Sequence, residues 1–497
     1  MATVAIVRTL VALINLFMRL LRPAKPSSND TIPHFEWSSW RVRITMLHHH
    51  SMHITLPQLD TSSNFDPKTL ATTGMEKYDH LREEEIKLRM DLEVTNSNYR
   101  WFMLALSGAT ATLAVAAPSM AMPVLFSEIA DDLHLSLVQI GAVWGTVSFA
   151  GLFAGLAGGM LGDRFGTKRT LTVACLLLGL AGASRGLSNG LLAMTVTVFL
   201  SGLVSATIPM NLHKVCATWF SGKQLGKANA VISGGMALGF MIGSLISATI
   251  LSPWLGGWRN VLFFYGGIAV LMSVPWAFTE TATSEQERLA RGRHGPSIRQ
   301  TFSHVARLRD VWILGIALLG VGGGVQGLLG YLPLYLRGIE WSASRADATL
   351  ASFHAISLIA VIPLAWLSDR LGSRKQLLVA ATLIAAAGIG LLSIVEGAVI
   401  WVAVLMAGAV RDGYMAVFMT TVTELKGVGA AYAGTAIGLA MTLSRVGGLI
   451  APPLGNGLAR FGARTPFILW AAMTLLGLAV LSLARRRRTR AETVGSA

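Results

Sequence analysis

The chain has 497 residues, of which 53% are hydrophobic and only 13% are charged, and its formal net charge is +15. Soluble domains carry about 25% charged residues, so this composition excludes an ordinary soluble protein. The basic residues lie in short clusters between long apolar runs, which indicates membrane topology and argues against nucleic-acid binding. Two cysteines, Cys175 and Cys216, lie in or at the end of apolar runs and form neither a disulfide framework nor a metal-ligand spacing.

The first 98 residues differ in composition from everything that follows. They are mostly polar and are interrupted by several prolines, so they cannot bury much apolar surface. We expect residues 1–98 to form a cytoplasmic extension that is disordered or partly amphipathic, unless translation starts at Met75 or Met90. Histidines at positions 48–50 and 53 lack a second ligand cluster, so we predict no metal site and no cofactor.

From Trp101 onward the sequence contains twelve apolar runs of about 20 residues, the length that crosses a bilayer. Lipid offers no partner for unpaired backbone groups, so we predict an all-α membrane protein with twelve transmembrane helices. The runs are 101–122, 138–161, 171–188, 191–211, 229–251, 260–279, 311–336, 348–367, 376–395, 398–420, 430–451 and 465–484. They predict a six-helix bundle at 99–280, a cytoplasmic linker at 281–310, a second six-helix bundle at 311–485 and a basic cytoplasmic tail at 486–497.

Lysines and arginines predict the orientation of these helices. If residue 100 is cytoplasmic, the loops on that side and the C-terminal tail contain 21 basic residues, and the loops on the other side contain 6. The excess of basic residues marks the cytoplasmic side. We therefore expect both ends of the helical core in the cytoplasm. We also expect a monomeric, multi-pass protein of a cell membrane, in particular a bacterial inner membrane.

The two halves of the helical core carry a repeated motif. Asp163-Arg164-Phe-Gly166 follows the second run, and Asp369-Arg370-Leu-Gly372 follows the eighth, with the two aspartates 206 positions apart. The Gly202 and Gly408 pair, in the fourth and tenth runs, has the same separation. Two matches at one offset indicate that the second bundle repeats the first.

The loop at 159–169 resembles the signature loop between helices two and three of the major facilitator superfamily. The loop at 365–375 is similar to the weaker copy between helices eight and nine, and Thr167 departs from the basic residue that the family usually has there. The resemblance covers roughly residues 100–485. It implies two six-helix bundles, related by a pseudo-two-fold axis, which rock around a central cavity and expose it to alternate sides of the membrane.

The same resemblance implies a gate at these loops. In such proteins the loop aspartate meets the positive N-terminus of a neighbouring helix and holds one conformation of the transporter. The residues that we expect to act in gating or coupling are Asp163, Arg164, Gly166, Arg169, Asp369, Arg370 and Asp412.

Ionisable and amide side chains deep inside the apolar runs indicate a binding site, because burying them in a bilayer is unfavourable. With a rise of about 1.5 Å per residue, Gln326, His354 and Arg445 lie roughly 20–23 Å from the cytoplasmic helix ends, and Arg411 lies at roughly 14 Å. Gly322 and Gly330 share the helix face of Gln326 and would leave room beside it. The residues that we expect to bind substrate are Arg445, Arg411, His354, Gln326 and Tyr331.

Each of these residues also has a structural interpretation. Arg411 or Arg445 could form an ion pair with Asp412, and His354 could be a satisfied group in the helix packing. Tyr331 could belong to the aromatic belt at the membrane interface. The sequence leaves these alternatives open.

Two arginines against one carboxylate leave a positive charge in the predicted cavity, and arginine binds carboxylates through two parallel hydrogen bonds. We therefore expect a secondary transporter of a small organic anion, such as a carboxylate, with a proton as a possible co-substrate. The alternatives are a drug or metabolite exporter of the same superfamily and a non-transporting membrane receptor. The sequence contains no metal-protease, serine-hydrolase or nucleotide-binding motif, so we expect no enzyme.

Glycines in the fifth run bear on the exporter alternative. Gly235, Gly239 and Gly243 lie four positions apart, on one helix face, and predict close packing against another helix. Drug/proton antiporters of the superfamily usually have a proline after the last glycine of this motif, whereas Ser244 follows here. This difference counts against an exporter but does not exclude one.

The predicted gate can be tested at Asp163. The variant Asp163→Asn should insert into the membrane normally but transport much more slowly, because an amide loses most of the attraction of a carboxylate to a helix N-terminus. Initial rates of uptake, normalised to the amount of inserted protein, measure this effect. Normal turnover would mean that the loop only sets topology.

Overall fold

The computed structural model describes residues 98–279, 298–371 and 374–494, and within these ranges every regular element is a helix. The predicted extension, up to residue 97, and residues 281–297 of the predicted linker lie outside the described residues, as does residue 280. The all-helical membrane fold predicted from the apolar runs is confirmed.

The N-terminal half comprises the helices from α3 to α11. Its first span is continuous from Tyr99 to Leu133 but contains a π-helical segment, η1. The elements are α3 (Tyr99–Ala109), η1 (Thr110–Ala116), α4 (Ala117–Leu133), α5 (Leu137–Phe165), α6 (Thr167–Ser184), η2 (Arg185–Leu187), α7 (Leu191–Ser205), α8 (Ile208–Trp219), α9 (Gly222–Ile246), η3 (Ser247–Leu251), α10 (Ser252–Leu255) and α11 (Trp258–Phe278).

The C-terminal half comprises the helices from α13 to α20. A short helix, α13, precedes its first span. The elements are α13 (Ile298–Ala306), α14 (Arg309–Gly338), α15 (Ala343–Leu371), α16 (Arg374–Leu391), α17 (Val399–Ala409), α18 (Arg411–Thr423), α19 (Gly429–Leu458), η4 (Ala459–Phe461) and α20 (Thr465–Val494).

Eleven helical stretches of the described chain are long and apolar enough to cross a membrane. A twelfth apolar stretch, Thr465–Leu481, is the first part of α20, which continues to Val494. Large apolar side chains such as Leu192, Ile362 and Phe278 are among the most exposed residues, as expected for surfaces that face lipid rather than water. The chain is therefore a multi-pass membrane protein.

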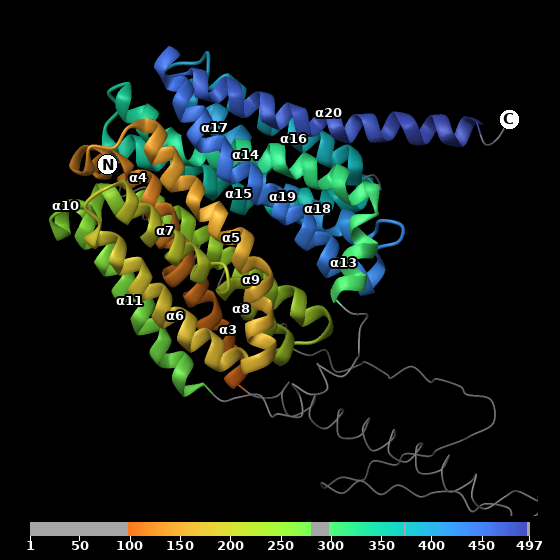
Figure 1. Cartoon of the computed structure of the whole chain (residues 1–497), viewed down its shortest axis with the longest axis horizontal. Helices are drawn as coiled ribbons and strands as arrows, with labels where there is room; N and C mark the ends of the chain where they lie inside the picture. Colours follow the sequence, from red (N-terminus) through yellow and green to blue (C-terminus); the bar gives the residue numbers. More distant parts are fainter. Residues whose placement is uncertain (1–97, 280–297, 372–373, 495–497) are drawn as a thin grey trace, which may run out of the picture. The chain divides into compact units, whose positions relative to one another are not determined.

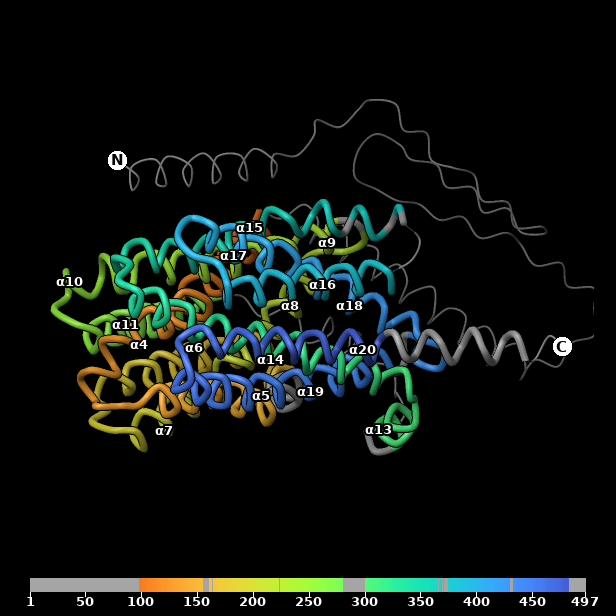
Figure 2. Tube along the Cα trace, turned by 90° about the horizontal axis from the view of Figure 1, so that it is seen from above, coloured from red at the N-terminus to blue at the C-terminus, as the bar shows by residue number. Residues whose placement is uncertain are grey.

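The two halves meet along specific helix pairs. In Figure 1 the helices of the N-terminal half, coloured orange to green, gather on one side, and those of the C-terminal half, coloured green to blue, gather on the other. Helix α5 lies beside α19, and α9 lies beside α15, as Figure 2 also shows from above. Helix α4 contacts α14 between these pairs.

Small residues allow α5 and α19 to approach closely. A Cβ atom added at Gly141 would lie 2.8 Å from the carbonyl oxygen of Pro452. One at Gly145 would lie 2.6 Å from the carbonyl oxygen of Leu449. The backbones are therefore in direct contact, as in other membrane helix pairs with small residues at the interface.

The two ends of α5 follow from local sequence. At its start, Ser136 and Gln139 form a reciprocal capping box, in which the Gln139 N–H donates to Ser136 Oγ (3.3 Å) and the Ser136 N–H donates to Gln139 Oε1 (2.8 Å). At its end, Gly166 adopts φ of +82° and turns the chain into α6, a conformation that glycine adopts without steric strain.

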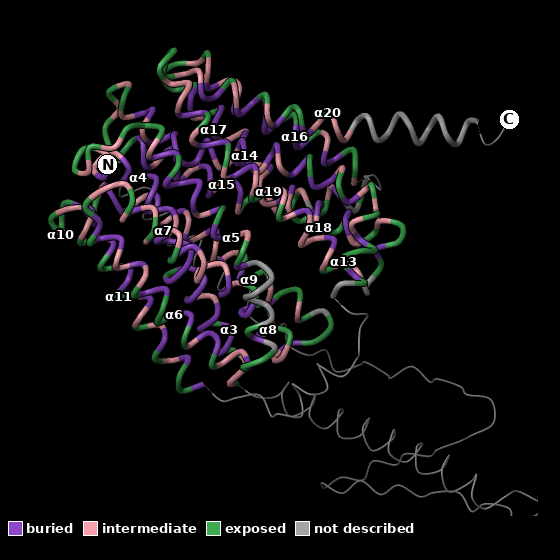
Figure 3. The backbone as a smooth tube through the Cα atoms, viewed as in Figure 1, coloured by how far each residue is buried: buried purple, intermediate pink, exposed green. Residues whose placement is uncertain are grey.

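We call the end of the molecule where α5 meets α6, and α15 meets α16, the basic end, and the other the distal end. At the distal end one core cluster contains residues of both halves, whereas towards the basic end each half has its own cluster. Figure 3 shows the buried residues, in purple, where the helices meet. Representative residues are Phe126, Trp144, Tyr331 and Phe353 in the shared cluster, Leu171 and Trp276 in the N-terminal one, and Leu378 and Phe418 in the C-terminal one.

The glycine face predicted in the fifth run is confirmed as a packing face. A Cβ atom added at Gly235 would lie 2.9 Å from the carbonyl oxygen of Gly108, and one at Gly239 or Gly243 would overlap the backbone of η1 or α4. These glycines bring α9 against the first span.

This packing predicts the effect of two matched substitutions in α9. Gly239→Leu should prevent close packing and strongly lower the melting temperature, or abolish folding, because no side chain fits against the Thr112 carbonyl. Gly226→Leu is the control, since a Cβ atom there meets no atom within 4 Å. Thermal unfolding in detergent measures both; equal stability of the two variants would contradict the assignment.

Candidate solute cavity

A cavity of about 250 Å³ lies mainly among helices of the C-terminal half. Of the described residues that line it, only Ser148, on α5, belongs to the N-terminal half. The lining residues are Ser148, Leu318, Val321, Gly322, Val325, Gln326, Leu329, Ala381, Ala385, Ala407, Val410, Arg411, Tyr414, Met415, Met441, Ser444, Arg445 and Gly448. Mostly apolar walls with a few polar groups are typical of a small-molecule site.

The tenth span is interrupted at the cavity. Helix α17 ends at Ala409, Val410 separates the two helices, and α18 begins at Arg411. The fourth span has a matching interruption after Ser205, which lies 206 positions before Arg411. Paired interruptions in the two halves of a transporter point to its binding site.

Arg411 lines this cavity and also has partners within the protein. Its guanidinium forms an ion pair with the carboxylate of Asp412 at 3.0 Å and lies over the ring of Phe240, 5.3 Å from its centre. The backbone N–H of Asp412 donates to Ser357 Oγ at 3.2 Å. The structure thus contains the ion pair that the sequence left open for Arg411, beside the cavity rather than away from it.

Arg445 lines the cavity from α19 and is an exposed residue. Across the part of the chain that the structure describes, its guanidinium has no hydrogen-bond or ion-pair partner. The guanidinium lies against α5, where a Cβ atom added at Gly151 would be 3.0 Å from both Cζ and Nε of Arg445. The alternative of an ion pair between Arg445 and Asp412 is therefore not observed among the described residues.

His354 is not among the described residues that line the cavity. Its side chain is 1% exposed, and neither ring nitrogen has a hydrogen-bond partner in the described ranges. The imidazole packs between Phe240 and Phe353, with ring centres 5.3 Å apart in both pairs. The ring of Phe240 thus contacts both His354 and the guanidinium of Arg411.

Gln326 lines the cavity, and its backbone carbonyl accepts a hydrogen bond from Trp144 Nε1 at 2.8 Å. Gly322 borders the cavity together with Gln326, with Ser444 close beside it, whereas Trp144 occupies the face of Gly330. The room expected beside Gln326 is therefore present at Gly322 and absent at Gly330, where a side chain of the other half packs against the glycine.

Tyr331 is buried at the distal end and does not line the cavity. Its hydroxyl donates to the carbonyl oxygen of Ala463 at 3.0 Å, and its ring packs against Phe467 and Trp470. The structure thus brings Arg411, Arg445 and Gln326 together around one cavity, and it places His354 and Tyr331 outside the lining.

The predicted gating residues of the two loops lie at the basic end of each half, whereas Asp412 lies beside the cavity in its ion pair with Arg411. The guanidinium of Arg164 lies over Phe165, and that of Arg370 lies over Trp366, with distances of 5.5 and 4.0 Å to the ring centres. Arg169 is exposed at the start of α6. The side chains of Asp163 and Asp369 lie outside the described part of the structure, so the proposed latch stays a prediction.

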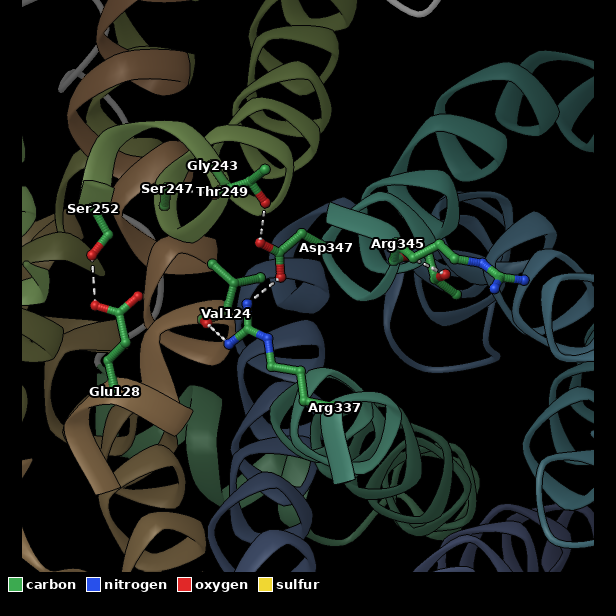
Figure 4. Close-up of polar contacts among 10 residues, drawn as sticks. Val124, Glu128, Gly243, Ser247, Thr249, Ser252, Arg337, Arg345 and Asp347 are labelled. Atoms are coloured by element: carbon green, nitrogen blue, oxygen red, sulfur yellow. Dashed lines mark hydrogen bonds and ion pairs between the residues drawn. The ribbon is translucent and has the colours of Figure 1, made fainter. Parts of the chain in front are cut away.

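At the distal end a polar network joins the two halves. Arg337, on α14, donates from Nη1 to the carbonyl oxygen of Val124 at 2.5 Å and from Nη2 to Asp347 Oδ1 at 2.7 Å. Thr249, on η3, donates to the other carboxylate oxygen of Asp347 at 2.6 Å. Figure 4 shows Asp347 between Thr249 and Arg337, with the side chain of Arg345 directed elsewhere.

Sequence reasoning missed this network. The predicted runs seven and eight ended at residue 336 and began at residue 348, so Arg337 and Asp347 fell in a loop. In the structure both residues belong to the helices, and the carboxylate of Asp347 is 0% exposed. The signal available was a pair of opposite charges that flank a short loop, but such pairs are also common at solvated helix ends.

Comparison with known proteins agrees with this architecture. The family model described as Major Facilitator Superfamily matches residues 104–452. Among solved structures, a bacterial homologue of the human lysosomal transporter Spinster, in an inward-facing and occupied conformation, is similar over 79% of this chain and 98% of its own. The TM-score is 0.64 at 15% sequence identity, so this likeness concerns the fold alone.

Two similar relatives have named solutes. The cis,cis-muconate transport protein of Acinetobacter baylyi is 25% identical over 289 residues, which are 56% of this chain and 68% of the relative. The "Probable galactarate/D-glucarate transporter GudP" of Escherichia coli is 30% identical over 193 residues, which are 37% of this chain and 38% of the relative.

The distal network predicts a stability effect. Arg337→Gln should destabilise the protein by about 3–5 kcal/mol, because it leaves the buried carboxylate of Asp347 without a cation. The double variant Arg337→Gln with Asp347→Asn should recover most of this loss, because no charge is then left buried. Thermal unfolding in detergent measures both variants.

The control for this network is Arg345→Gln. Arg345 is exposed, lies two residues from Asp347 and stacks on Trp341 at 4.3 Å. Its loss should change stability by less than about 1 kcal/mol. If Arg337→Gln were as stable as this control, the network would not hold the halves together.

Proposed function

Because the chain belongs to the major facilitator superfamily, we propose that it is a secondary transporter that carries a small organic anion by alternating access. One observation carries the choice of an anion: the guanidinium of Arg445 lines the cavity without a partner among the described residues. A charge within the membrane-spanning part of a protein needs an anion, a carbonyl group or water to offset its desolvation. A bound carboxylate would supply that anion.

The charge balance of the cavity supports this proposal. The charged side chains in the lining that the structure describes are Arg411 and Arg445, and no carboxylate belongs to it. Asp412 neutralises Arg411, and Arg445 retains its positive charge. A guanidinium presents paired N–H donors that match the two oxygens of a carboxylate. Gln326 and Ser444 could then hydrogen-bond to other polar groups of the solute.

The named solutes of the relatives also support an organic acid as substrate. Muconate and galactarate or glucarate all carry carboxylate groups, and a cavity with positively charged side chains suits any of them. The identities of 25% and 30% over part of the chain support the class of solute and not one compound.

The packing of the two halves supports the proposed cycle. At the distal end they share a core cluster and the network of Arg337 and Asp347, whereas towards the basic end their clusters are separate. In our proposal this conformation is closed at the distal end, and rocking of the halves exposes the cavity to the other side. We propose that the basic end, and with it both ends of the helical core, faces the cytoplasm, and the excess of basic residues there supports this orientation.

The proposal is tested at Arg445. In proteoliposomes the parent should take up at least one acid from a labelled panel of cis,cis-muconate, D-glucarate and benzoate. Arg445→Ala should weaken binding about a hundredfold or more, because removing a charged partner typically costs about 2–5 kcal/mol. Arg445→Lys should retain weak transport, because the lysine ammonium keeps the positive charge but lacks the paired N–H donors of the planar guanidinium.

Arg460→Ala is the matched control for Arg445. Arg460 lies just beyond the same helix, is exposed, and stacks on Phe461 at 4.6 Å. It should leave uptake unchanged. Substrate-induced thermal stabilisation of each variant separates binding from transport, and binding by Arg445→Ala as tight as that of the parent would refute the role of Arg445.

A further inference from the structure

Ser148 is the single side chain through which the N-terminal half reaches the described cavity lining. It lies in the middle of α5, is 4% exposed and carries a hydroxyl that can both donate and accept hydrogen bonds. Buried hydroxyls are normally hydrogen-bonded within the protein. A hydrogen bond from this hydroxyl to another group of the protein would therefore indicate a structural role.

Most buried serine and threonine side chains of these helices bond to their own backbone. Thr146, two residues before Ser148, donates to the carbonyl oxygen of Ala142 at 2.8 Å. Ser244 and Ser247 donate in the same way to carbonyl oxygens four residues earlier. Ser148 makes no such bond and has no other hydrogen-bond partner within the described ranges. Its hydroxyl is therefore not used in bonding to its own helix, and Ser148 borders the cavity.

The position of this hydroxyl relates it to Arg445. Ser148 Oγ lies against α19 at Gly448, where an added Cβ atom would be 2.5 Å away. One helical turn away, at Gly151 of α5, the same two helices bring the guanidinium of Arg445 against α5. Ser148 and Arg445 thus lie on facing turns of α5 and α19, and both line the same cavity.

We propose that Ser148 is a substrate-binding residue, whose hydroxyl donates a hydrogen bond to the same anionic group that Arg445 holds. This inference rests on the proposed function. A carboxylate has about four acceptor positions, so it accepts two bonds from the guanidinium and still accommodates a hydroxyl. Gly151 and Gly448 provide the space for the two side chains to converge, because any larger residue at either position would contact one of them.

The bond from Ser148 would give the anion a contact with each half of the protein. Arg445 belongs to the C-terminal half and Ser148 to the N-terminal half, so a bound anion would join α5 and α19 at the level of the cavity. A ligand shifts a conformational equilibrium only through contacts that differ between the states. The bond to Ser148 is such a contact, since it exists only while these two helices are adjacent.

The test uses the full-length protein in proteoliposomes with labelled cis,cis-muconate, D-glucarate and benzoate as probes. Ser148→Ala should raise KM for the transported acid about tenfold or more, as expected for the loss of a hydrogen bond to a charged group. Thr146→Ala is the matched control, because its hydroxyl bonds to its own helix and is absent from the cavity lining. It should leave KM unchanged.

A double-variant experiment distinguishes substrate binding by Ser148 from a purely structural role. If Ser148 and Arg445 bind one anionic group, adding Ser148→Ala to Arg445→Lys should weaken binding less than it does in the parent. If Ser148→Ala weakened binding by the same factor in the parent and in Arg445→Lys, the proposal for Ser148 would be overturned. An unchanged KM for Ser148→Ala would overturn it as well. If the alanine variant does not insert, Ser148→Cys gives the same comparison, because a thiol has a similar shape and is a weak donor.

The outcomes separate this inference from the proposed function. Uptake of none of the acids by the parent, or full binding by Arg445→Ala, would contradict the proposed function. A parent that transports an acid, with Arg445→Ala inactive and Ser148→Ala unaffected, would leave the anion carrier intact and refute only the contact with Ser148.

Discussion

Direct backbone contact between α5 and α19 brings the two halves of this transporter together along a line from the distal end to the cavity. Glycines at 141 and 145 remove the side chains that would separate the helices. Asn456 then reaches the carbonyl oxygen of Leu137 at 2.8 Å. The same contact continues to Arg445, so the packing of this helix pair also determines where the guanidinium lies. A substitution that pushed α5 and α19 apart would move the guanidinium of Arg445 away from the cavity.

The internal repeat shows how one scaffold carries two different sets of side chains. At the offset of 206 positions, His354 corresponds to Ser148, and Arg445 corresponds to Gly239. Gly239 packs α9 against the first span, whereas Arg445 faces the cavity. The duplicated backbone thus provides the two bundles. The charged side chains of the cavity lie in the second copy, and the first copy contributes a hydroxyl.

How far the sequence predicts this structure depends on the type of signal. Apolar length and loop charge identify the helices, because the bilayer constrains every span in the same way. Arg411, Arg445 and Gln326 could be predicted to meet because a charged or amide group inside an apolar run is conspicuous. Ser148 could not, since a hydroxyl in a helix usually bonds to its own backbone. Its free orientation depends on contacts of α5 with a helix some 300 positions away.

The positive charge of Arg445 constrains the proposed transport cycle. In a conformation open at one end, water can reach the guanidinium and offset its desolvation. A conformation closed at both ends would exclude that water and leave an isolated charge inside the membrane, which is strongly unfavourable. An anion bound to Arg445 removes this penalty, so closure is easier with substrate than without it. Because Ser148 and Arg445 belong to different halves, the same anion would also hold together the surfaces that must meet in that closed conformation.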